Sequence, residues 1–354
     1  MNVISQIFKD KKSLPLNTFI DKALYNKKYG YYSKKNPIGT KGDFITAPLI
    51  SELFGEMVAV WCIAFWEKLR KPKNINIVEL GPGEGSLCMT LIKVFSRFKI
   101  FSDAFEIKLL EKSKFLRKIQ EKKITSKKVK WIKSIEEIKN GPTIFIANEF
   151  FDALPIKQFV LKKGIWHERF VKCINDEKLI FYDKKANLNN IKYFARLSLA
   201  KKQKFIEFPI EAIKYLTSIS KIIKKHAGGM ICFDYGYKKI KMSDSLQSVK
   251  KHDYSKILLN VGNSDITHHI NFNLFSKIIR NLGLHLEGIT EQGIFLQKMG
   301  IIHRANILTK NVNFNVKADV YYRLKRLMSR SEMGKIFKVI FFNKKGVKFN
   351  LGFK

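Results

Sequence analysis

"INIVELGPGEGSLCMTLIKVF", residues 75–95, is the stretch of sequence that decides the fold. Its first six residues, "INIVEL", predict a strand, and "SLCMTLIKVFSRF" is predicted to be a helix. Gly81, Gly83 and Gly85 separate the two, so that the chain turns tightly and leaves bare backbone open to a ligand. A strand, a glycine-rich turn and a helix in this order are typical of the first unit of a parallel α/β sheet.

The same alternation of strand and helix continues outward from this stretch. Further strands are predicted at 106–111, 128–132, 143–149 and 228–236. The alternation stops at 157–173, which predicts a hairpin that turns at Gly164. Helices are predicted for "FNLFSKIIRNLG" (272–283) and "DVYYRLKRLMSR", with two strands around Gly293 in 284–300.

We therefore expect an α/β protein with a doubly wound, Rossmann-like sheet and right-handed crossovers. The expected parts are a helical N-terminal cap (1–70), a sheet domain in two pieces (71–155 and 226–304), an inserted subdomain (156–225) and a helical, basic C-terminal segment (305–354).

The composition limits the classes of function. The chain has 354 residues and a formal net charge of +37, which favours acidic partners such as nucleic acid. Only ten of the 67 basic residues are Arg, however, and the Lys are spread along the whole chain, so we expect a compositional bias and no nucleic-acid partner. Four scattered Cys predict free thiols in a reducing compartment and no metal site. We expect no signal peptide or transmembrane segment and a cytoplasmic location.

The chemistry of the turn "ELGPGEG" (79–85) indicates a particular cofactor. No Gly-Lys-Ser/Thr follows it, which excludes a phosphate loop, and Ser86 stands where the dinucleotide fingerprint has Gly or Ala. Glu79 would repel a pyrophosphate and suits a cationic amino group, while Glu111, after the second strand, is placed to accept hydrogen bonds from ribose hydroxyls. The combination fits S-adenosylmethionine. The alternative is a structural turn that carries a surface acid.

A second group of polar residues follows the strand at 143–149. Asn148, Glu149 and Asp152 lie where the carboxyl end of a parallel strand faces a ligand, so the two acids could grip a cationic group. They could equally cap a following helix, since Asp and Asn favour that position.

These residues also resemble a known family. The stretches "GDFITAP…SELFGE" (42–56), "ELGPGEGSL" (79–87), "ANEFFDALPIKQFV" (147–160), "FDYGY" (233–237), "SDITHHINF" (264–272) and "EQGIFLQKMGI" (291–301) are similar to those of the MidA-like class I methyltransferases. That family includes the mitochondrial complex I assembly factor, which methylates an arginine. The chain departs from the family pattern at Leu49, Glu84 and His268.

The resemblance implies roles for the matching residues. It places Glu149 on the substrate guanidinium, with Asn148 and Asp152 beside it, and Pro82 together with the three glycines on the cofactor. A guanidinium stays protonated, with a pKa above about 12, so a carboxylate must orient it before its nitrogen can attack. The resemblance further implies that Asp43 and Thr46 line the methyl-donor site. Helix capping is the alternative for these two residues.

Three more residues, Asp234, Asp265 and His269, are expected in the cleft. For His269 a structural hydrogen bond is an equal alternative, and its pairing with His268 lacks the spacing of a zinc site.

The expected function is S-adenosylmethionine-dependent methylation of a protein arginine, with a respiratory NADH dehydrogenase subunit as the partner that the resemblance implies. The alternatives are an RNA methyltransferase and a cofactor-binding assembly chaperone without turnover. The sequence leaves the oligomeric state open, with a homodimer among the alternatives.

Overall fold

The computed structural model describes residues 3–9, 11–34, 37, 39, 42–175, 178–187, 189, 192, 197–199, 203–250 and 253–354. The chain divides into two compact units. We call residues 45–150, 217–237 and 279–354 the sheet unit, and residues 1–44, 151–216 and 238–278 the insert unit. Parts of the expected insert, among them 176–177, 193–196 and 200–202, lie outside the described residues.

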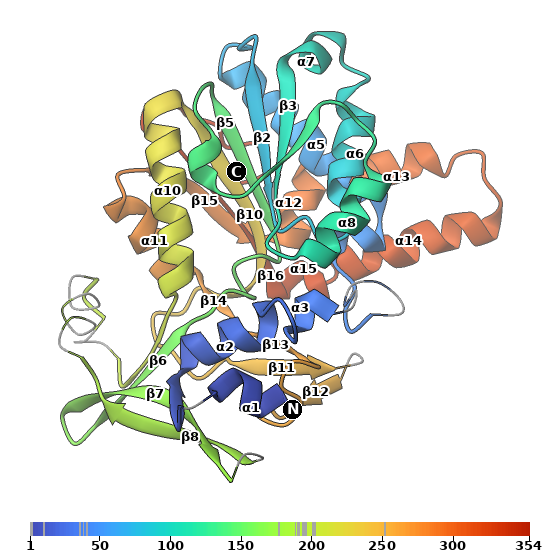
Figure 1. Cartoon of the computed structure of the whole chain (residues 1–354). Coiled ribbons are helices and arrows are strands. Elements are labelled where there is room, and N and C mark those ends of the chain that lie inside the picture. The colour runs from blue at the N-terminus through green and yellow to red at the C-terminus, as the bar shows by residue number, and fades with distance from the viewer. Residues whose placement is uncertain are drawn as a thin grey trace. The chain divides into compact units, whose positions relative to one another are not determined.

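The sheet unit is built around a mostly parallel sheet with the strand order β15-β16-β10-β5-β2-β3-β4 (Figure 1). The strands are β2 (Ile75–Leu80), β3 (Phe105–Leu110), β4 (Val129–Ile132), β5 (Thr143–Asn148), β10 (Gly228–Tyr237), β15 (His285–Glu291) and β16 (Phe337–Asn343). The five strands from β10 to β4 pair in parallel, and β16 pairs antiparallel with β10 and with β15. This arrangement confirms the expected α/β class and the strands predicted at 75–80, 106–111, 128–132, 143–149 and 228–236.

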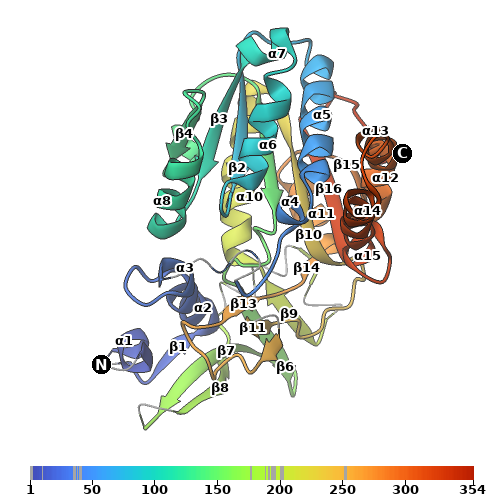
Figure 2. The same ribbon diagram turned by 90° about the vertical axis from the view of Figure 1, so that its right-hand side faces the viewer.

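The central strands are buried on both faces, as is typical of a parallel sheet. All six residues of β2 are buried, as are the first five of β5, which is the pattern of strands covered on both faces. Helices α5 (Glu52–Lys68) and α6 (Ser86–Phe95) pack together beside these strands (Figure 2). Their buried side chains share one core with the sheet: Trp61, Phe65, Leu91, Phe95, Ile77 and Ile107.

The C-terminal part of the sheet unit differs from the expectation in two places. The second strand expected near Gly293 is wrong, because the segment is helix α12 (Gln292–Lys298). Phe295 and Leu296 are both fully buried, a consecutive pair that one face of a strand cannot provide. A Cβ on Gly293 would lie 2.4 Å from the Met328 carbonyl oxygen, so glycine is required for this close approach. The segment expected to be helical and basic also supplies β16, a fully buried strand.

The insert unit has its own sheet and core. Strands β6 (Lys157–Lys162) and β7 (Ile165–Ile174) form the expected antiparallel hairpin, with Gly164 at a φ of 77° in the turn. β1 (Ser13–Pro15) and β8 (Lys178–Lys185) pair with β7, and β9 (Phe205–Phe208) pairs with β6. Helix α2 (Leu16–Tyr25) contributes Phe19 and Leu24 to a core with Val171. A small sheet joins β11 (Gln247–Lys250), β12 (Asp253–Ser255) and β13 (Asp265–Thr267).

Candidate functional site

The glycine-rich turn leaves β2 and enters α6 through residues that adopt positive φ angles. Gly81, Gly83 and Gly85 have φ values of 63°, 56° and 85°, a region that other residues occupy only with strain. Gly81 is also tightly enclosed, since a Cβ there would lie 2.8 Å from the Phe150 ring. The Gly85 amide donates to the Pro82 carbonyl over 2.8 Å and closes the turn. Glycine is therefore needed for the backbone path as well as for room beside it.

Glu79, at the end of β2, is a buried acid with unused hydrogen-bonding capacity. The residue is 3% exposed, and among the described residues its Oε2 has no hydrogen-bond partner. Burial, with a smaller contribution from Glu111, raises the pKa of Glu79 to about 8. A buried carboxylate oxygen without a partner is costly, and a cationic ligand group would relieve that cost. The amino group of S-adenosylmethionine has the required charge and donors.

Glu111 follows β3 and is half-buried. Its Oε1 accepts from the Ser113 amide at 2.7 Å, and its Oε2 accepts from the Gln120 side chain at 3.2 Å. Burial raises the pKa of Glu111 to about 7, while these hydrogen bonds favour the charged form. Each oxygen keeps a lone pair that a ribose hydroxyl can use.

Sequence reasoning missed Gln120, which lies on helix α8 (Lys114–Lys123) and is fully buried. A signal existed, because Gln120 falls four residues after Leu116 on the face of the helix that is otherwise apolar. Glu84, the acid that departs from the family pattern, forms an ion pair with Lys123 at 2.6 Å, so its charge is balanced locally.

Glu149, directly after β5, has an unusual backbone conformation. Its φ of 51° is a left-handed conformation for a residue that carries a side chain. Its amide donates to the Phe233 carbonyl on β10 at 2.9 Å, and its Oε1 accepts from the Asn148 side chain at 3.2 Å. Backbone strain that the surroundings enforce is a common property of functional residues.

The alternative that Asn148, Glu149 or Asp152 caps a following helix is wrong, because residues 149–156 form bends and a turn that lead to β6. Thr46 precedes the short helix α4 (Ala47–Ile50), but its side chain makes no capping hydrogen bond. Glu149 Oε1 accepts from the Ala47 amide instead, at 3.4 Å. Asp234 is fully buried in β10.

The insert unit brings three of the expected acids together. Asp43, Asp152 and Asp265 are all buried, and burial together with the nearby charge of Asp152 raises the pKa of Asp265 to about 7. Tyr31 donates to Asp43 at 2.5 Å, and Tyr32 donates to both oxygens of Asp265 at 3.1 Å. These tyrosines were not predicted, because they lie far from Asp265 in the sequence.

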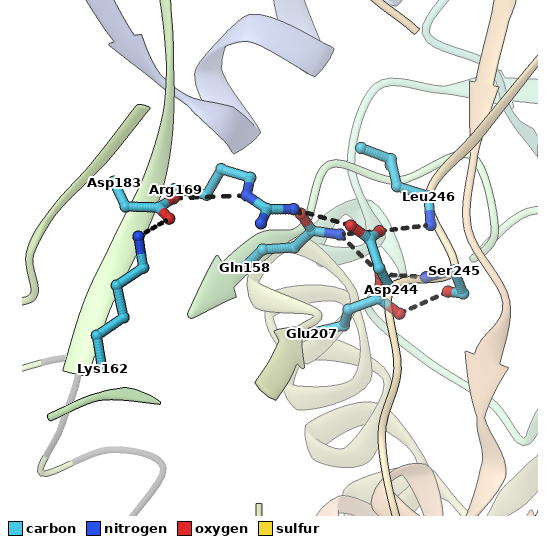
Figure 3. A network of polar contacts seen from close by, with 8 residues as sticks. All are labelled: Gln158, Lys162, Arg169, Asp183, Glu207, Asp244, Ser245 and Leu246. Carbon is cyan, nitrogen blue, oxygen red and sulfur yellow. Dashed lines mark hydrogen bonds and ion pairs between the residues drawn. The ribbon is translucent and has the colours of Figure 1, made fainter. Parts of the chain in front are cut away.

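Figure 3 shows a polar network of the insert unit around Gln158, Glu207 and Ser245, and the backbone of His269 is hydrogen-bonded to this network. The His269 amide donates to Ser245 Oγ at 3.0 Å, and that hydroxyl donates to Glu207 at 2.5 Å. Gln158 donates to Glu207 and to Asp244, at 2.9 and 2.8 Å. Arg169, on β7, donates to Asp244 at 2.8 Å and to the Gln158 side chain at 2.9 Å. The hairpin thus fixes the segment that carries His269, and burial lowers the pKa of that histidine.

The comparison with protein families shows which family the chain belongs to. Residues 57–290 match a family model described as "Putative S-adenosyl-L-methionine-dependent methyltransferase". The chain belongs to this methyltransferase family. The match covers more than half of the chain and includes the glycine-rich turn, Glu79, Glu111 and Glu149. The enzyme is a methyltransferase that uses S-adenosylmethionine, as its sequence predicted.

Curated relatives cover nearly the whole methyltransferase. Protein arginine methyltransferase NDUFAF7, mitochondrial, of Xenopus laevis is 30% identical over 361 residues, which span 94% of this chain and 82% of the relative. The Homo sapiens protein of the same name is 26% identical, over 94% of this chain and 80% of its own length.

A solved structure supports the same fold. The crystal structure of a COG1565 superfamily member from Burkholderia thailandensis, with S-adenosyl-homocysteine bound, has a TM-score of 0.81 and 21% identity. The match covers 99% of the methyltransferase and 93% of that chain. Throughout the described part of the methyltransferase, each helix is too short or too polar to cross a bilayer.

Proposed function

We propose that this methyltransferase modifies an arginine side chain of a protein. The observation that carries the proposal is a pair of acids at the carboxyl ends of the neighbouring strands β2 and β5, Glu79 and Glu149. One acid suits the amino group of the cofactor, and the other suits a guanidinium. The relatives named protein arginine methyltransferase support this choice of substrate.

The cofactor side of the site is assigned to the glycine-rich turn, to Glu79 on strand β2 before it and to Glu111 directly after β3. S-adenosylmethionine supplies an electrophilic methyl group on a sulfonium. Glu79 holds the amino group, and Glu111 accepts from the ribose hydroxyls. The backbone of Gly81, Pro82, Gly83 and Gly85 leaves room for the ligand, and Thr46 is proposed to line the same site.

The substrate side is assigned to Glu149, with Asn148 as its orienting neighbour. A carboxylate pairs with a guanidinium through two parallel hydrogen bonds, which fix the plane of the group. Fixing this plane aims one nitrogen and removes much of the orientational entropy of the reaction. The left-handed backbone of Glu149, tied to Phe233, sets the direction of the carboxylate.

The remaining assignments rest on the motifs that resemble the family. We propose Asp43 as a cofactor contact, and Asp152, Asp234, Asp265 and His269 as substrate contacts. Each of these residues lies in a matching motif. For Asp265, the ordered Tyr32 hydroxyl keeps the carboxylate in one orientation.

The methyl acceptor that we propose is a subunit of a respiratory NADH dehydrogenase. The proposed location of the reaction is the cytoplasm. Mass spectrometry of the NADH dehydrogenase subunits, purified from cells with and without the methyltransferase gene, tests whether one of them is the substrate. A methylated arginine that disappears with the gene supports it, and identical arginine methylation in the two samples contradicts it.

Glu149→Gln separates the proposed function from its alternatives. Gln keeps the shape but loses the charge that a guanidinium requires, so we expect methylation of acceptor protein to fall by at least about 100-fold. Binding of S-adenosylhomocysteine, measured by calorimetry, is expected to stay within about 3-fold of the wild type, because Glu149 is assigned to the substrate. If the NADH dehydrogenase complex assembles fully in cells that carry only the Gln variant, the protein acts as an assembly chaperone without turnover. Methyl transfer to purified RNA but not to protein would indicate an RNA methyltransferase.

A further inference from the structure

The amide of Gln120 connects two parts of the cofactor site that are far apart in the sequence. Its Nε2 donates to the Gly83 carbonyl at 2.7 Å and to Glu111 Oε2 at 3.2 Å. Its Oε1 accepts from the Trp131 indole at 2.9 Å. The side chain is fully buried, so these partners satisfy it without water.

The orientation of this amide follows from the chemistry of its neighbours. An indole N–H can only donate, so the amide oxygen must face Trp131. Both amide hydrogens then point the other way, toward a carbonyl and a carboxylate, which can only accept. A reversed amide would put an oxygen against two acceptors and a donor against a donor. Trp131 therefore selects the one orientation of Gln120 that links Gly83 with Glu111.

The link leaves Glu111 little freedom. The Ser113 amide holds Oε1 at 2.7 Å, and Gln120 holds Oε2, so both carboxylate oxygens are fixed from the protein side. The lone pairs that remain point away from these donors. The same amide holds the middle of the glycine-rich turn, so the turn and the acid form one rigid arrangement before the ligand arrives, which lowers the cost of binding.

We propose that Gln120 is a positioning residue of the cofactor site, which fixes the Glu111 carboxylate and the Gly83 backbone as one unit for the ribose. Trp131 acts through Gln120 by setting its orientation. The inference rests on the proposed assignment of Glu111 to the ribose hydroxyls, and it does not depend on the identity of the methyl acceptor.

Calorimetric titration with S-adenosylhomocysteine tests the inference through a double-mutant cycle. Gln120→Met keeps the length of the side chain and removes its hydrogen bonds, and we expect about 10-fold weaker binding. In a Glu111→Gln background the same substitution is expected to cost less, about 2- to 4-fold, because the charged group it positions is gone and only the support of the Gly83 backbone is still lost. If Gln120 only stabilised the fold, Gln120→Met would weaken binding by the same factor with Glu111 and with Gln at position 111.

A cofactor analogue gives a second readout. Wild-type protein should prefer S-adenosylhomocysteine over its 2′-deoxy analogue, and Gln120→Met should reduce that preference by at least about 3-fold. Gln203→Met is the matched control. Gln203 is also a buried glutamine with two backbone partners, Ile240 and Met242, but it belongs to the insert unit. We expect the control to leave the preference unchanged.

Trp131→Phe provides the test if Gln120→Met does not fold, because it removes the indole donor and keeps a smaller aromatic ring. Its loss of affinity should be smaller, about 2- to 5-fold, and should also shrink in the Glu111→Gln background. If the losses of affinity in the single variants simply add up in the double variants, Gln120 does not position Glu111, and the proposal is wrong. If Glu111→Gln alone leaves the affinity intact, the assignment of Glu111 to the ribose is wrong, and the proposed arginine methylation still stands.

Discussion

At the scale of single residues, the site contains acids that the folded chain holds at a cost. Glu79 is buried with an oxygen that has no partner among the described residues, and Glu149 has a left-handed backbone. Both features reduce the stability of the protein without its ligands. Their presence at the ends of β2 and β5 supports the proposal that these two acids bind ligands.

The raised pKa of Glu79 predicts how stability depends on pH. A carboxyl with a folded pKa of about 8 keeps a proton that the unfolded chain releases near the ordinary glutamate pKa of 4.5. The folded state therefore binds more protons between these values, and stability falls as the pH rises toward 8. Glu79→Gln should remove this loss and raise the unfolding free energy at pH 8 by roughly 1–3 kcal/mol.

Thermal unfolding of the cofactor-free protein at pH 6, 7 and 8 measures the effect. Glu67→Gln is the control, since Glu67 is half-exposed and forms an ion pair with Lys71 in the same unit. The Glu79 variant should also bind S-adenosylhomocysteine at least about 10-fold more weakly, because it lacks the charge that pairs with the amino group. A stabilised variant with unchanged affinity would contradict the assignment.

The backbone of Glu149 predicts an order of stability among substitutions that all remove its carboxylate. Glycine adopts a φ of 51° without strain and alanine does not, so Glu149→Gly should be more stable than Glu149→Ala by about 1 kcal/mol. Urea denaturation of the two variants measures the difference. Equal stabilities would mean that the position carries no strain.

At the scale of elements, the β2–turn–α6 unit depends on the close approach of Phe150 to Gly81. Gly81→Ala adds a Cβ 2.8 Å from that ring at a φ of 63°, whereas Gly164→Ala has a similar φ of 77° with no atom within 4 Å. Gly164→Ala should therefore cost only the backbone term, about 1 kcal/mol, and Gly81→Ala about 2–3 kcal/mol. Denaturant titration of both variants gives the two costs. Equal costs would show that Phe150 moves aside freely.

Strand β16 predicts that the C-terminal segment is essential for folding. It lies between β10 and β15, and Ile340 is fully buried, so Ile340→Asp should destabilise the protein by at least about 3 kcal/mol. Phe314→Ser, at a side chain that is 81% exposed in the same unit, is the control and should change stability by less than about 0.5 kcal/mol. A cooperative, wild-type-like melt of the Ile340 variant would argue against the strand.

At the scale of the whole molecule, the net charge of +37 predicts a strong dependence of nucleic-acid binding on salt. Contacts of Lys with phosphate release counterions, so binding to bulk tRNA should weaken by at least about 100-fold between 50 and 300 mM KCl. Methylation of an acceptor protein should change far less if a desolvated ion pair carries recognition. Filter binding and a methyl-transfer assay over the same salt series compare the two. Equal salt dependences would favour RNA as the acceptor.

The parts of the fold that were predicted correctly are those that local sequence specifies. β2, β5 and β10 are apolar runs ended by polar residues, and the hairpin at Gly164 is marked by its turn. The wrong predictions lie where contacts with residues distant in the sequence decide the secondary structure. The segment after Gly293 is apolar enough for a strand, but it forms helix α12, and Gly293 packs against the Met328 carbonyl far along the chain.

The sequence by itself determined the α/β class, the glycine-rich turn and the acids that follow the strands, because apolar runs, glycines and strand ends are local properties. Only the tertiary structure decided that Gln120 links Gly83 with Glu111, that Tyr32 holds Asp265, and that β16 lies inside the sheet. The reason is physical: hydrogen bonds and burial depend on which side chains meet in space, and residues 37 positions apart, such as Gly83 and Gln120, share no local signal of that meeting.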